Sequence, residues 1–169
     1  MNLTRSELKA ADATMNQLRN AIYHLGRFMG KNGVEDLATR FHQMGRNIAK
    51  TYYAYWNPIE MVSLNNIRDV IATIYKEILN SSVGVEINNT EKVIVVRDSG
   101  CALCKYHYED IEIAGCEILL GLISEYINQI NLHSKKNPEI FIEPLNVQES
   151  RAYGNKSCIQ IFKYKRSET

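Results

Sequence analysis

The chain has 169 residues, and its 20 lysines and arginines are balanced by 19 aspartates and glutamates. This length predicts a single domain, which buries roughly 70% of the surface of its unfolded chain and needs no disulfides for stability. The balanced charge argues against nucleic-acid binding, which depends on a basic surface. Charged residues punctuate residues 3–20, so we expect neither a signal peptide nor a transmembrane segment, and we predict a cytoplasmic protein.

The first 33 residues predict a long amphipathic helix. Thr4 and Glu7 fit a capping box, and Gly30 and Gly33 end the helical pattern. The apolar face is wide, which is typical of a helix buried on more than one side or of one that pairs with another subunit. Apolar residues recur on this face at steps of three and four, as Leu8, Ala11, Met15, Leu18, Ile22, Leu25 and Met29.

Two further helices are predicted, at about residues 34–56 and 64–79. The first ends before Pro58, because the residue preceding a proline is pushed out of helical geometry. One side of it carries Leu37, Phe41, Met44, Ile48, Tyr52 and Tyr55, and the second helix carries Ile67, Val70, Ile71, Ile74 and Ile78.

From residue 83 onward the apolar pattern changes to that of strands. Residues 83–87 and 92–97 predict a β-hairpin, residues 114–131 a fourth helix, and residues 139–147 and 157–164 a last pair of strands. Gly121 in the fourth helix costs about 1 kcal/mol relative to alanine, so we expect it to serve close packing. The order predicts one α+β domain, with a four-helix layer on a small antiparallel sheet, a helical part at 1–82 and a mixed part at 83–169.

Two local patterns resemble known families. The stretch Gln43-Met44-Gly45-Arg46-Asn47-Ile48, followed by Asp69-Val70-Ile71-Ala72, resembles the Bet-three-like core subunits of the TRAPP vesicle-tethering complex. The second half resembles the related 4-vinyl reductase domain, a small-molecule-binding module, through Gly115-Cys116, Gly121, Gly154 and Cys158. The two families share a fold, and together the resemblance covers nearly the whole chain.

The resemblance implies a dimer built on helices and an apolar channel between helices and sheet. We place the contacts to a second copy, or to a related TRAPP-like subunit, at Leu18, Ile22, Leu25, Met44 and Tyr52. We place the channel at Met61, Ile67, Val70, Ile71 and Ile74. In the eukaryotic subunits the position of Met61 holds a cysteine that carries a fatty-acyl chain. Methionine cannot be acylated, so we expect either a non-covalent apolar ligand or side chains that fill the space themselves.

The four cysteines all lie in the second half, as a CxxC pair at Cys101 and Cys104 followed by Cys116 and Cys158. Four thiolates are a usual donor set for tetrahedral zinc, and a CxxC turn supplies two of them. The pair follows a predicted strand, Cys116 begins a helix and Cys158 begins the last strand, so we expect them to converge. Ordinary buried thiols are the alternative. A redox role is disfavoured, because no thioredoxin-like βαβ unit surrounds the pair.

The resemblance also bears on these cysteines. Binding-domain relatives hold zinc with cysteines like Cys116 and Cys158, a glutamate and a further cysteine. Arg151 stands where that further cysteine is expected, and Glu149 lies about one residue from the acidic position. Cys101 and Cys104 would then replace the missing pair.

No catalytic residue is predicted. The four histidines show no ligand spacing, and the sequence has neither a nucleophile elbow nor a phosphate-binding loop. The acidic residues around the cysteine pair, Asp98, Glu109, Asp110 and Glu112, are interpreted as a solvated loop.

We therefore predict a non-enzymatic, TRAPP-like assembly subunit, which the resemblance links to vesicle tethering with peripheral membrane contact, or to activation of a small GTPase. The alternative is a sensor of the 4-vinyl reductase type that takes a small apolar ligand. Neither hypothesis requires a cofactor beyond the structural zinc and the apolar ligand already named.

Overall fold

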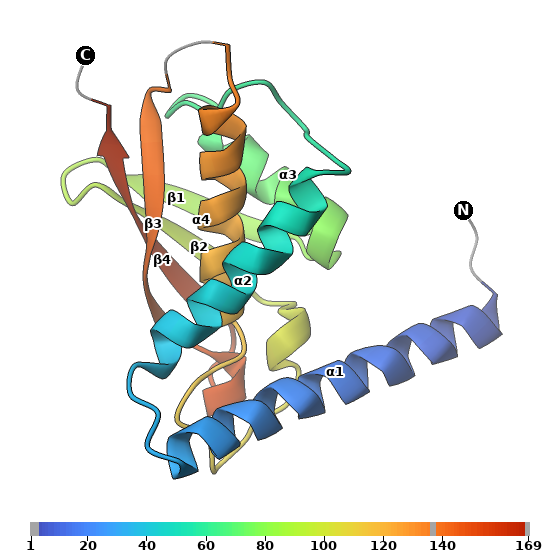
Figure 1. Cartoon of the computed structure of the whole chain (residues 1–169). Coiled ribbons are helices and arrows are strands. Elements are labelled where there is room, and N and C mark those ends of the chain that lie inside the picture. Colours follow the sequence, from blue (N-terminus) through green and yellow to red (C-terminus); the bar gives the residue numbers. More distant parts are fainter. Residues whose placement is uncertain (1–3, 136–137, 168–169) are drawn as a thin grey trace.

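The computed structural model describes residues 4–135 and 138–167, which form four α-helices and one four-stranded sheet (Figure 1). This confirms the α+β fold. The elements follow in the order α1 (Arg5–Lys31), α2 (Leu37–Tyr53), α3 (Ile67–Leu79), β1 (Val83–Asn88), β2 (Val93–Asp98), η1 (Ala102–Cys104), α4 (Glu117–Leu132), β3 (Ile140–Glu149), η2 (Arg151–Tyr153) and β4 (Cys158–Arg166), where η1 and η2 are single 3-10 turns.

The sheet has the order β1-β2-β4-β3, and every neighbouring pair is antiparallel. The predicted hairpin is formed by β1 and β2, and β4 enters between β2 and β3. The edge strand β3 contains Pro144 and pairs irregularly with β4 at two places, between Pro144 and Asn146 and between Val147 and Glu149. Because β2 pairs with β4 from Val93 to Asp98, the end of β2 lies beside the start of β4.

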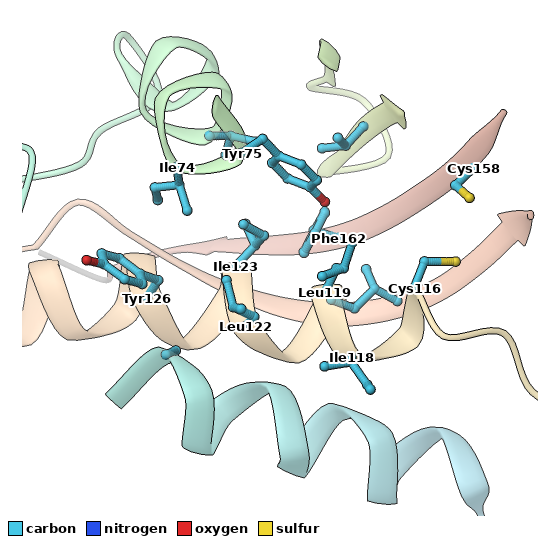
Figure 2. Close-up of a cluster of buried hydrophobic side chains, with 14 of the residues drawn as sticks. Ile74, Tyr75, Cys116, Ile118, Leu119, Leu122, Ile123, Tyr126, Cys158 and Phe162 are labelled. Atoms are coloured by element: carbon cyan, nitrogen blue, oxygen red, sulfur yellow. The ribbon is translucent and has the colours of Figure 1, made fainter. Parts of the chain in front are cut away.

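The helices lie in two tiers on one face of the sheet (Figure 1). The first tier is α3, which packs mainly against β1, and α4, which packs against β3 and β4; α2 then packs on α4. Figure 2 shows side chains of α3 and α4, among them Ile74, Tyr75 and Ile123, meeting Phe162 of the sheet. These four residues are fully buried. The helical layer is therefore two helices thick at α2, because α4 separates α2 from the strands.

Two glycines allow α2 to approach α4 closely. A Cβ atom added at Gly121 would lie 1.9 Å from the carbonyl oxygen of His42, and one added at Gly45 would lie 1.9 Å from the carbonyl oxygen of Ile118. Both distances are far below van der Waals contact, and both neighbours are backbone atoms. The expectation that Gly121 serves close packing is confirmed.

Helix α1 has the predicted capping box. The Thr4 side chain accepts a hydrogen bond from the Glu7 backbone N–H, and the Glu7 carboxylate accepts one from the Thr4 N–H. Its N-terminal half extends away from the rest of the chain, and residues 5–14 are all exposed (Figure 1). Arg19 and Tyr23 are the buried anchors that hold its C-terminal half. The wide apolar face of α1 was expected to reflect either burial on more than one side or pairing with another subunit. The first expectation is wrong, because the N-terminal half of the helix is exposed.

The residues assigned to the apolar channel are mostly buried. Ile67, Val70, Ile71 and Ile74 pack into the hydrophobic core, each 5% exposed or less, and Met61 is half-buried in the loop before α3.

No helix in the described part of the chain combines the length and hydropathy that crossing a bilayer requires.

Candidate functional site

The four cysteines converge at the point where three segments meet. The Sγ atoms of Cys101, Cys104 and Cys158 all lie within 4.8 Å of one another. Cys116 lies beside this group, with its Sγ atom 3.5 Å from the Ser150 Oγ atom, which is itself 3.7 Å from Cys158 Sγ. None of the four is in a disulfide, and each is at most 1% exposed. The predicted convergence is thus present for Cys101, Cys104 and Cys158, and Cys116 lies next to them.

Local chain geometry explains why they meet. Asp98, the last residue of β2, lies opposite Cys158 at the start of β4. The chain then bends, since the Asp98 Oδ1 atom accepts hydrogen bonds from the Gly100 N–H at 2.9 Å and the Ser81 hydroxyl at 2.6 Å. The turn η1 follows, with the Cys104 N–H donating to the Cys101 carbonyl. Cys116 stands at the N-cap of α4, as Figure 2 shows.

The hydrogen bonds around the cluster distinguish two sulfurs as acceptors. Bonds with the other thiols, first of all with Cys101, hold the pKa of Cys104 well below its usual value and also lower the pKa of Cys158. The same bonds raise the pKa of Cys101 and Cys116. From outside the cluster, the Tyr23 hydroxyl donates to Cys104 Sγ and the Arg151 backbone N–H donates to Cys158 Sγ, both at 3.4 Å. These contacts favour ionisation of Cys104 and Cys158 over that of Cys101 and Cys116.

Ser150 completes the surroundings of the cluster. This fully buried side chain lies between two of the sulfurs, with its Oγ atom 3.5 Å from Cys116 Sγ and 3.7 Å from Cys158 Sγ. Arg151 contributes its backbone N–H rather than a side-chain ligand, and Glu149 is the last, partly buried residue of β3.

The interpretation of Asp98 as part of a solvated loop is wrong. Its side chain is fully buried, because β4 and the cysteine turn enclose it, and burial raises its pKa. Its Oδ2 atom has no hydrogen-bond partner among the described residues. The only sequence signal for this burial was its position at the end of an apolar strand. Tyr23 and Ser150 were also missed, since neither lies near a cysteine in the sequence.

A second feature is an apolar groove of about 1010 Å³ between α1, α2 and the cysteine turn. One wall is the middle of α1, from Ala11 to Ile22, and the opposite wall is α2. Its floor is the first half of α4 and the end of α3, and Cys101 lies at its edge. The apolar lining residues supplied by α1, α2 and α4 are Ala11, Met15, Leu18, Ile22, Met44, Ile48, Tyr52, Ile118, Leu119 and Leu122.

The groove contains most of the residues expected to contact a partner. Leu18, Ile22, Met44 and Tyr52 line it, whereas Leu25 is 39% exposed and lies outside it. Leu18 and Tyr52 are nearly half exposed. The five residues assigned to the channel do not line this groove.

Comparison with known proteins matches the fold but not the sequence. No family model matches the chain, and no curated protein matches it. A solved structure does match: the crystal structure of a trafficking protein particle complex subunit 3 from Naegleria fowleri, covalently bound to palmitic acid. Its TM-score is 0.68 at 14% sequence identity, over 91% of this chain and 96% of that one. The chain therefore has the fold of a TRAPP subunit of the Bet-three-like type.

Proposed function

We propose that this protein is an assembly subunit that associates with a second copy of itself through the apolar groove. The observation that supports the proposal is the pairing of two features on one chain. Helix α1 projects an apolar stripe, and the groove beside it is apolar and open. In a two-fold symmetric dimer each chain supplies the same surface, so the α1 stripe of one copy would cover the groove of the other.

The exposed residues agree with this arrangement. Leu8 is 54% exposed and Leu18 is 47% exposed on α1, and Tyr52 is 44% exposed on α2. Single exposed apolar residues are common, but Leu18 and Tyr52 lie together in an apolar groove, which is typical of an interaction site. The matching fold belongs to a protein named as a subunit of a complex, which favours assembly over catalysis. No catalytic step is assigned to the chain.

Leu18→Asp tests the dimer. The charge would have to be buried in the interface, so we expect wild-type protein at twice the mass of one chain and a monomeric variant in sedimentation velocity. The change should weaken association at least tenfold, which corresponds to about 1.4 kcal/mol.

Leu145→Asp is the matched control. Leu145 is 51% exposed on β3, outside the groove, so this variant should remain dimeric. A monomeric wild-type protein, or equal weakening by both variants, would contradict the proposal. If the wild type instead purifies only with a different subunit, the groove serves a related chain and not a second copy.

A small apolar ligand is the second candidate, and the size and lining of the groove favour it. Ligand pockets are about 300–1000 Å³ and mostly apolar, and the groove has about 1010 Å³. The matching structure holds palmitic acid covalently. Met61, the position where the resemblance places an acylated cysteine, has no thiol and does not line the groove, so the ligand proposed here is a non-covalent one. Native mass spectrometry with added palmitic acid tests this candidate: binding to a monomer supports it, and an unliganded dimer opposes it.

As a more specific form of the first proposal, the assembled protein would act in vesicle tethering or in activation of a small GTPase. Such a role belongs to the assembled complex, so it is tested on the dimer by flotation with anionic vesicles and by nucleotide exchange on a purified small GTPase.

A further inference from the structure

The four cysteines have an arrangement that ordinary core thiols do not require. They are the only cysteines of the chain, they come from three separate segments, and they meet at one fully buried point. Apolar packing alone gives no reason for all four to meet, since an aliphatic side chain would fill any of these positions equally well.

We propose that Cys101, Cys104, Cys116 and Cys158 bind one zinc ion. In a tetrahedral zinc–thiolate site the sulfurs lie about 2.3 Å from the metal and so about 3.8 Å from one another. Three of the sulfurs already lie within 4.8 Å of one another, and the Cys116 Sγ atom lies beside them, 3.5 Å from the Ser150 Oγ atom that also approaches Cys158 Sγ at 3.7 Å. Side-chain rotation that brings the Cys116 Sγ atom to the other three sulfurs would complete the site. This proposal does not depend on the proposed dimer.

The surroundings of the cluster suit thiolates. The Tyr23 hydroxyl and the Arg151 backbone N–H donate to Cys104 and Cys158, and such donors stabilise the charge of metal-bound sulfur. Nearby, Arg19 is 3% exposed, and its guanidinium donates from Nε to the Ala102 carbonyl at 2.7 Å. A buried cation beside this turn would offset part of the negative charge of a zinc tetrathiolate.

The chemistry of the donors selects the metal. Four sulfur ligands in a tetrahedral arrangement favour zinc or iron and exclude magnesium and calcium, which prefer oxygen. The close spacing of three sulfurs favours one metal ion over an iron–sulfur cluster, whose ligands are attached to different iron atoms. On binding, four thiols would lose their protons to solvent and four Zn–S bonds would form, with no change of oxidation state.

Metal analysis of the full chain tests the proposal. Protein purified without added metal should contain one zinc per chain by mass spectrometry of the elements. Metal-free protein, prepared with a chelator, should take up one equivalent of zinc. With cobalt in place of zinc, the absorption bands of tetrahedral cobalt–thiolate should appear.

A double variant and its control connect the metal to these residues. Cys101→Ser/Cys104→Ser should lower the zinc content from one per chain to none. Ser157→Ala should leave it unchanged, because Ser157 is buried next to Cys158 but offers no thiol.

A thiol count on wild-type protein keeps the test decisive if the double variant fails to fold. The native protein should show no thiol reactive to a chromogenic disulfide reagent, and all four should react once a chelator has removed the metal. A folded wild-type protein that takes up no zinc, contains iron instead, or holds a disulfide would overturn the proposal. Equal zinc content in both variants would overturn it too.

Discussion

At the scale of single residues, the glycines at the crossing of α2 and α4 set how closely the two helices pack. Gly121→Ala would place a methyl group within 1.9 Å of the His42 carbonyl oxygen, and a backbone atom cannot move aside as a flexible side chain can. We expect the free energy of unfolding to fall by about 3 kcal/mol, the upper end of the usual cost of overpacking. Urea denaturation followed by circular dichroism measures the change.

Gly84→Ala is the control for this prediction. Gly84 lies on β1 with a negative φ, and an added Cβ would meet nothing within 4 Å. Its substitution should change stability by less than about 0.5 kcal/mol. Similar costs for the two glycines would show that close packing is not the reason for Gly121.

Only some of these single-residue roles could be predicted from the sequence. The role of Gly121 could be predicted, because a glycine inside an apolar helix needs a reason. The partner glycine on α2 could not, since nothing in a single sequence indicates which two helices cross. Asp98 shows the same limit: its burial comes from pairing with β4, a segment 60 residues further along the chain.

At the scale of elements, one buried arginine attaches α1 to the cysteine turn. Arg19 donates to the Ala102 carbonyl, and Arg19→Met would leave that carbonyl without its partner while keeping most of the apolar volume. Hydrogen bonds to charged groups contribute about 1.5–3 kcal/mol, so we expect a loss of about 2 kcal/mol in chemical denaturation.

Arg27→Met is the matched control on the same helix. Arg27 pairs with Asp110 at 2.6 Å, but the Asp110 side chain is 70% exposed. Exposed ion pairs contribute at most about 1 kcal/mol, so this variant should be nearly as stable as the wild type. A larger loss for Arg27→Met than for Arg19→Met would show that α1 is held elsewhere.

The predicted elements were right in type and order, but the sequence pattern did not identify the face of α2 that packs on α4. The large apolar residues that the pattern places on one side of α2 include Met44, Ile48 and Tyr52, and these three line the open groove. The face that packs on α4 contains Phe41, Gly45 and Ala49. An apolar pattern at helical spacing identifies the large apolar side chains, whereas two helices that cross closely meet through small residues. The groove could not be predicted, because it depends on the angle between α1 and α2.

At the scale of the whole molecule, the helical part and the mixed part depend on each other. Helix α2 packs on α4, and α3 packs on β1, so the apolar faces of the first 82 residues are covered by later segments. A fragment of residues 1–82 should therefore lack stable tertiary structure, with poorly dispersed amide signals in a nitrogen-correlated spectrum. Co-expression with residues 83–169 should restore dispersion. A fragment 1–82 that folds alone would show two domains instead of one.

The two edge strands of the sheet, β1 and β3, differ in how readily they could pair with a strand of another molecule. On β3, Pro144 has no N–H to donate and two irregularities interrupt the pairing with β4, so an incoming peptide finds no regular row of partners there. The other border, β1, pairs without interruption along its six residues. Edge-to-edge aggregation of the kind that leads to fibres is therefore discouraged at β3 but not at β1. A lysine or proline introduced on the exposed edge of β1 should suppress it there.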